Sequence, residues 1–189
     1  MKAARKTIRE MTDEEIFSEI SKRQISALMF HDQMADMCEF LNLTGFRCWH
    51  EKQYIEESKE MQKTKRYFMS THNKLIFIDD VEQPQELIPD SWYSYTRLDV
   101  DAQILRQHTE SGLMAYKIWE ETSKRLYEQC AKALLEMGNV CDYAYVEKLI
   151  EDVNVELDQI YQRIAKFKSV DYDMTYIMEM QDKLSRKCK

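Results

Sequence analysis

The sequence predicts an all-α protein built around one four-helix bundle, and three observations support this. Only 3 Gly and 2 Pro occur in 189 residues, well below the roughly 7% and 5% of ordinary proteins, so few turns interrupt the chain. Apolar residues recur over long stretches at the three- and four-residue spacing of helices. Two short connections and one long connection join these stretches, and connection length decides which helices pair. We expect one domain over residues 1–189.

The first two predicted helices span about residues 12–42 and 46–72. Thr12 and Glu15 have the spacing of a capping box, which marks a helix start. The Asn-Leu-Thr-Gly run that follows residue 41 supplies the stop. Because about three residues join the two helices, they must form an antiparallel hairpin.

The second predicted pair spans about residues 98–137 and 142–168. Gly138 ends the first of these helices, and the short connection again requires an antiparallel hairpin. A short C-terminal helix is expected over residues 171–187, with Asp171 as its cap.

The crossover linker, residues 73–97, contains both prolines of the chain. Twenty-five extended residues reach about 80 Å, whereas a helix of 27 residues is about 40 Å long. The linker can therefore return the chain to the end of the bundle where the second helix began. Two antiparallel hairpins joined by one long crossover form the connectivity of ferritin-like bundles. Over residues 12–168 the chain thus resembles the ferritin-like four-helix-bundle superfamily in topology.

Composition and charge exclude several classes of protein. The net charge is −7 with basic and acidic residues interspersed, so nucleic acid is not an expected partner. No run of about 18 apolar residues is present to cross a membrane. The five cysteines are odd in number and form no Cys-x-x-Cys pair, and the basic N-terminus lacks the apolar stretch of a secretory signal. We therefore expect a reduced, cytoplasmic protein, with a disulfide between the neighbouring Cys38 and Cys48 disfavoured.

Three ionisable residues fall at the centre of apolar helix stripes, namely His31, Glu57 and His108. Burying such groups is costly unless they are paired or bound to a metal. Under the crossover topology all three lie about 16 Å below the same end of the bundle. Two imidazoles and one carboxylate form a ligand set for a transition metal. The sequence therefore predicts a metal site for iron, manganese or zinc.

The match to the di-iron members of the superfamily is incomplete. Those proteins carry Glu on two helices and Glu-x-x-His on the other two. Glu60 stands three residues after Glu57, where that motif has His, and no Glu-x-x-His occurs in the chain. His31 and His108 stand where the family has Glu. A site for a single metal ion is therefore the expectation.

A structural interpretation of the same residues stays open, in which His31, Glu57 and His108 form a buried hydrogen-bond network. Three further residues, His50, Glu60 and Ser111, are expected to form a secondary polar core beside this set, with His50 in a structural role. His72 is expected to face solvent.

Under the structural interpretation the protein is a non-catalytic interaction or assembly protein. Its self-association surface would include Met29, Tyr116 and Tyr127. A homo-oligomer, with a dimer favoured, is expected in either case. No Gly-rich phosphate loop, Gly-x-Ser-x-Gly turn or His-Glu-x-x-His motif is present, so the sequence does not decide whether the protein is an enzyme.

Overall fold

The structure, a computed structural model, describes residues 6–81, 84, 94, 96–186 and 188. Throughout this part of the chain the regular structure is helical, as the sequence predicts. The elements are η1 (Ile8–Glu10), α1 (Asp13–Phe40), α2 (Thr44–His72), α3 (Ala102–Glu136), α4 (Val140–Ser169) and α5 (Met174–Arg186).

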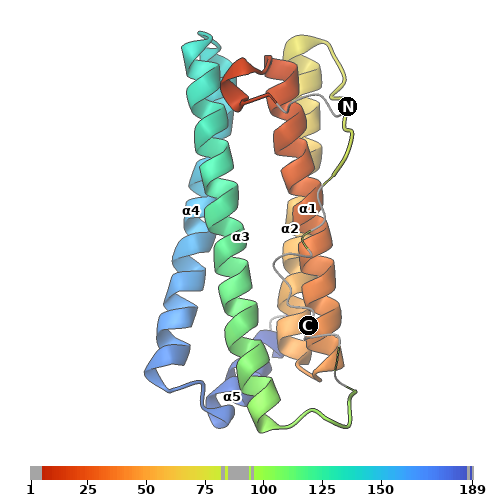
Figure 1. Cartoon of the computed structure of the whole chain (residues 1–189), viewed down its shortest axis with the longest axis vertical. Coiled ribbons are helices and arrows are strands. Elements are labelled where there is room, and N and C mark those ends of the chain that lie inside the picture. Colours follow the sequence, from red (N-terminus) through yellow and green to blue (C-terminus); the bar gives the residue numbers. More distant parts are fainter. Residues whose placement is uncertain (1–5, 82–83, 85–93, 95, 187, 189) are drawn as a thin grey trace.

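The four long helices form two antiparallel hairpins, α1 with α2 and α3 with α4 (Figure 1). Helix α2 ends at the upper end of the bundle, and α3 begins at the lower end, so the two helices run in the same direction. The connection between them therefore spans the length of the bundle. The predicted crossover is confirmed.

The start of the crossover lies along α1. The Ser18 hydroxyl donates a hydrogen bond of 2.6 Å to the carbonyl of Phe77, and Lys22 forms an ion pair with Asp79. These two contacts direct the chain down the side of α1 from the upper end of the bundle (Figure 1).

The bundle core is apolar along most of its length. Phe17, Phe30, Phe68 and Phe167 have no exposed surface, and residues three or four apart on each helix supply the rest of the core. Among the described helices, none combines the length and apolar character needed to cross a membrane.

The starts of α3 and α5 differ most from the sequence-based prediction, by three or four residues. Helix α3 begins at Ala102, because the Asp101 carboxylate accepts a hydrogen bond of 2.8 Å from the Ile104 amide and caps the helix there. Helix α5 begins at Met174, because Asp173 takes the capping role predicted for Asp171. Asp171 instead lies in the turn with a φ of 49°.

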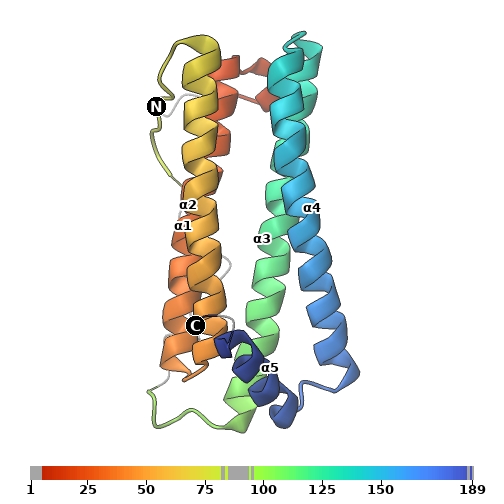
Figure 2. The same ribbon diagram turned by 180° about the vertical axis from the view of Figure 1, so that it is seen from behind.

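Helix α5 crosses the lower end of the bundle and packs against the start of α2 (Figure 2). A Cβ atom added to Gly45 would lie 1.9 Å from the carbonyl oxygen of Gln181, so only glycine permits this approach. Cys48 and Cys188 form a disulfide with their Cα atoms 6.3 Å apart, while Cys38 is a buried free thiol. The expectation that the cysteines stay unpaired is therefore wrong for this pair.

Candidate metal centre

Two of the three predicted ligands, His31 on α1 and Glu57 on α2, lie together in the middle of the bundle. Glu120 on α3 joins them, and one ligand atom from each residue lies within 4.8 Å of the other two. His31 is fully buried and Glu120 is 2% exposed. Three helices thus direct one imidazole and two carboxylates to a common point.

Glu57 and Glu120 line a small cavity together with three further carboxylates, namely Glu60 on α2 and Asp152 and Glu156 on α4. The cavity has a volume of about 20 Å³, which is room for one water molecule or one ion. The other side chains that line it are Arg23, Ala27, Trp119, Ser123, Tyr127 and Val153.

The carboxylates of the cavity disfavour one another's charge. Burial, followed by the negative charge of Glu156, raises the pKa of Glu57 and Glu120 well above the usual range of a carboxyl group. Burial and the charge of Asp152 raise the pKa of Glu60 to about 7. Burial and the charge of Glu60 raise the pKa of Glu156 to about 7 as well. A bound cation would relieve this repulsion.

His31 is oriented by a second imidazole. Its Nδ1 atom lies 3.0 Å from Nδ1 of His50, a hydrogen bond in which one ring donates and the other accepts. Burial lowers the pKa of His31 well below its usual range and that of His50 to about 3, so both rings are neutral at neutral pH. Within the described part of the protein, Nε2 of His31 and Oε1 of Glu120 are buried without a hydrogen-bond partner. Buried polar atoms are rarely left unsatisfied, so an ion or a water molecule between these two residues would supply the missing partner.

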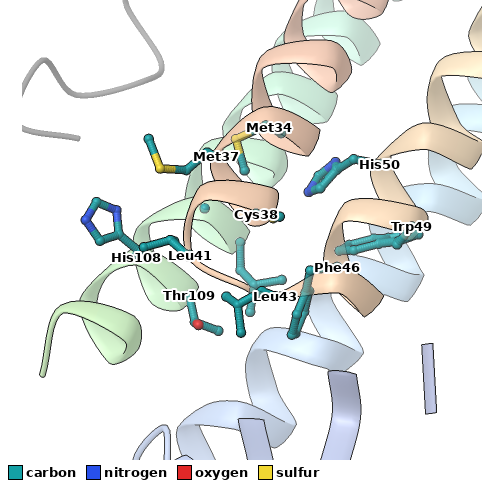
Figure 3. Close-up of a pocket in the computed structure, with 12 residues that line it drawn as sticks. Met34, Met37, Cys38, Leu41, Leu43, Phe46, Trp49, His50, His108 and Thr109 are labelled. Atoms are coloured by element: carbon teal, nitrogen blue, oxygen red, sulfur yellow. The ribbon is translucent and has the colours of Figure 1, made fainter. Parts of the chain in front are cut away.

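His108 lies elsewhere. It lines an apolar pocket at the lower end of the bundle together with His50, and in the view of Figure 3 the two rings lie on opposite sides of that pocket. Glu120 is 12 residues further along α3, about 18 Å higher in the bundle.

The position of His108 has a simple cause in the length of α3. This helix has 35 residues, against 28 and 29 in α1 and α2, and its lower end extends below the α1–α2 turn toward α5 (Figure 1). The residue of α3 that lies at the height of His31 is therefore Glu120 and not His108. Of the secondary polar residues, Ser111 bonds back to the carbonyl of Gln107 on its own helix at 2.7 Å and lies outside the cavity.

Sequence reasoning missed Glu120 and Glu156, although a signal for each was present. On α3 the buried positions follow alternating steps of three and four residues, which are Leu113, Tyr116, Glu120, Ser123, Tyr127, Cys130 and Leu134. Glu120 is thus the one carboxylate on a regular buried stripe. On α4, Glu156 follows the buried Val153 by three residues and precedes the buried Ile160 by four, so it lies on a stripe with the same spacing.

No family model and no curated protein matches the chain, but solved structures do. An open pore ferritin from the hyperthermophilic archaeon Archaeoglobus fulgidus is 15% identical, with a TM-score of 0.75 over 95% of this chain and 98% of that one. Apo-ferritin from Pseudo-nitzschia multiseries is 13% identical, with a TM-score of 0.71 over 89% and 95%. A PmFTN variant soaked in iron is 14% identical, with a TM-score of 0.71 over 89% and 95%. The chain therefore has the fold of the ferritin-like four-helix bundles.

Proposed function

We propose that the protein binds one transition-metal ion in the middle of its bundle, with His31, Glu57 and Glu120 as ligands. Glu120 takes the place that the sequence analysis assigned to His108. The observation that carries the proposal is that three ligand atoms lie within 4.8 Å of one another. In two of these residues, His31 and Glu120, a buried polar atom has no hydrogen-bond partner among the described residues.

The donor set fits a transition metal. Imidazole and carboxylate together suit iron, manganese or zinc, and iron is favoured because a structure of the same fold was obtained after soaking in iron. Carboxyl groups with raised pKa values hold protons that a metal ion would replace, so binding should release protons and strengthen as the pH rises. A bound metal would supply Lewis-acid or redox chemistry within this ligand set.

A groove between α2 and α4 offers an access route from solvent. Its lining includes Glu57, Glu60 and Glu156 from the cavity, and five carboxylates in all face two lysines there, so the groove is net negative. Negative charge along a cleft raises the local concentration of cations and speeds their association. The groove thus connects the proposed site with bulk metal.

The substitution Glu120→Gln tests the proposal, because it removes a charged ligand and keeps the side-chain shape. The native chain should bind about one Zn²⁺ or Mn²⁺ by calorimetry and metal analysis. The variant should bind at least about 100-fold more weakly, since changing even the hydrogen-bond partners of ligands costs roughly 10–100-fold. The matched control is Glu128→Gln, an exposed glutamate on the same helix, which should bind as the native chain does.

His108→Ala separates the two possible ligand sets. Unchanged affinity in this variant supports Glu120 as the third ligand. Loss of binding in His108→Ala but not in Glu120→Gln would restore the set of His31, Glu57 and His108. Native protein that takes up no metal at all would overturn the proposed function.

Self-association as a homo-oligomer, with a dimer favoured, is the second proposal, and it accompanies the alternative role as an assembly protein. Tyr116 and Tyr127 cannot form the expected surface, because they are 2% and 3% exposed. Leu75 and Phe77 at the start of the crossover are 77% and 73% exposed and are the better candidates for contact with a second copy. Light scattering of the purified protein measures the state, and a strict monomer would contradict it.

A further inference from the structure

Arg23 is the only basic residue among those described that line the central cavity. It projects from α1, and two contacts from α3 hold its guanidinium group. Its Nε donates a hydrogen bond of 2.8 Å to Oγ of Ser123, and its Nη2 donates one of 2.7 Å to the carbonyl of Trp119. The Cζ atom lies 3.3 Å from the centroid of the Trp119 ring. The position of this positive charge is therefore set by the fold.

The charge of Arg23 acts on the proposed ligands. It opposes the effects of burial and of neighbouring carboxylates on the pKa of Glu57 and Glu120. A guanidinium group stays protonated under all ordinary conditions. The cavity therefore contains one permanent positive charge whether or not a metal ion is bound.

The helices contribute unequally to the cavity. Each of three helices lines the cavity with carboxylates, which are Glu57 and Glu60 on α2, Glu120 on α3, and Asp152 and Glu156 on α4. Helix α1 lines it with Arg23 and Ala27, and its His31 lies beside the carboxylates of Glu57 and Glu120. Bundles that hold two metal ions direct a carboxylate inward from every helix. Helix α1 directs no carboxylate to this cavity, and the charged residue with which it lines the cavity is the cation Arg23. With room for about one ion, a second divalent ion would have to approach this fixed cation.

We propose that Arg23 limits the site to a single metal ion, by holding a positive charge where a second ion would otherwise bind. The inference rests on the proposed function, since it concerns the stoichiometry of the same site. Arg23 is a specificity-determining residue in this proposal and contributes no ligand.

Charge reversal and charge conservation at position 23 test the inference. The Zn²⁺ stoichiometry is measured by calorimetry and by metal analysis after gel filtration, with thermal unfolding as a check on folding. The native chain should bind one Zn²⁺, Arg23→Glu should bind two, and Arg23→Lys should return to one. A purely structural role would not produce this dependence on charge, because Lys loses the bonds to Ser123 and Trp119 but keeps the charge.

The matched control is Arg163→Gln. The Arg163 guanidinium also stacks on a tryptophan, with its Cζ atom 3.8 Å from the centroid of the Trp49 ring, but it does not line the central cavity. This variant should bind one Zn²⁺, as the native chain does. Two ions in Arg163→Gln would overturn the inference, because any loss of buried charge would then have the same effect.

The outcomes separate the inference from the proposed function. If the native chain and Arg23→Glu both bind one ion, the role of Arg23 is overturned and the metal site remains. If the native chain binds two ions, the role of Arg23 is overturned as well. No ion in the native chain overturns the proposed function instead. If Arg23→Glu does not fold, Arg23→Gln decides: loss of the repelling charge should strengthen binding of the first ion about tenfold, and unchanged affinity would overturn the inference.

Discussion

Two clusters in this bundle contain the same kinds of residue, one histidine and two carboxylates from three helices. The central cluster joins His31, Glu57 and Glu120, and a second cluster at the upper end joins Asp13, His72 and Asp142. In the upper cluster the two ring nitrogens of His72 face different aspartates, at 3.3 Å from Asp13 and 3.0 Å from Asp142. In the central cluster His31 bonds to another histidine and leaves Nε2 without a partner.

The difference shows that a list of ligand types does not define a metal site. In the upper cluster every group has a partner of the protein's own, since the hydroxyl of Tyr67 also donates to Asp142 at 2.9 Å. This cluster connects the start of α1, the end of α2 and the start of α4. In the central cluster like charges face one another in a cavity, which opposes folding unless a ligand compensates. The upper cluster therefore serves stability, whereas the central cluster is the one that we propose as a metal site.

The largest expected effect comes from Asp142→Ala in the upper cluster. Asp142 is 2% exposed, and its loss leaves His72 and Tyr67 without their partner, at a cost of about 3 kcal/mol in the free energy of unfolding. Urea denaturation measures the loss, and Zn²⁺ affinity should not change. Asp158→Ala on the same helix is the control, because Asp158 is exposed and accepts its hydrogen bond from Gln162, one turn further along α4. A variant as stable as the native chain would end the distinction between the clusters.

The second effect is a dependence of stability on pH that arises in the central cluster. The folded-state pKa of Glu60 and of Glu156 is about 7, above the usual 4.5. The folded state therefore holds protons that the unfolded state releases, and this stabilisation is complete below pH 4.5 and lost as the pH rises through 7. Metal-free protein should lose about 2 kcal/mol between pH 5 and pH 8 after allowance for partial exposure.

Denaturation of chelator-treated protein across this range measures the change. The double variant Glu60→Gln, Glu156→Gln should flatten the profile. Stability that rises with pH in the native chain, or a slope that persists in the double variant, would show that these carboxyl groups do not carry the effect.

The smallest of the three effects concerns His50. For His31 to bind a metal through Nε2, its Nδ1 must carry the proton. This N–H group then donates a hydrogen bond to Nδ1 of His50, 3.0 Å away. His50→Phe removes this acceptor and should weaken Zn²⁺ binding about tenfold, or 1.4 kcal/mol. His50→Gln, whose side-chain oxygen can accept the same bond, should recover most of the affinity. Equal affinity in all three proteins would mean that His50 does not orient the ligand.

The fold of this protein could be predicted from its sequence, whereas the candidate site could be predicted only in part, and the reasons are physical. The scarcity of Gly and Pro and the two short connections were sufficient for the two hairpins and the crossover. Local spacing also placed His31 and Glu57 on inward faces. The choice between His108 and Glu120 required the height of α3 relative to α1, and no local pattern reports the offset between helices that are distant in sequence. His72 was misplaced for the same reason, since its partners Asp13 and Asp142 come from other helices.

The sequence by itself determined the helices, their pairing and the presence of ionisable groups on buried faces, because periodicity and connection length act over short stretches of chain. The tertiary structure alone decided which of those groups meet. It set the register of α3, brought Glu156 in from α4, placed the guanidinium of Arg23 among the carboxylates and paired Cys48 with Cys188. These features depend on side-chain packing between helices, where a displacement of one turn exchanges one neighbour for another.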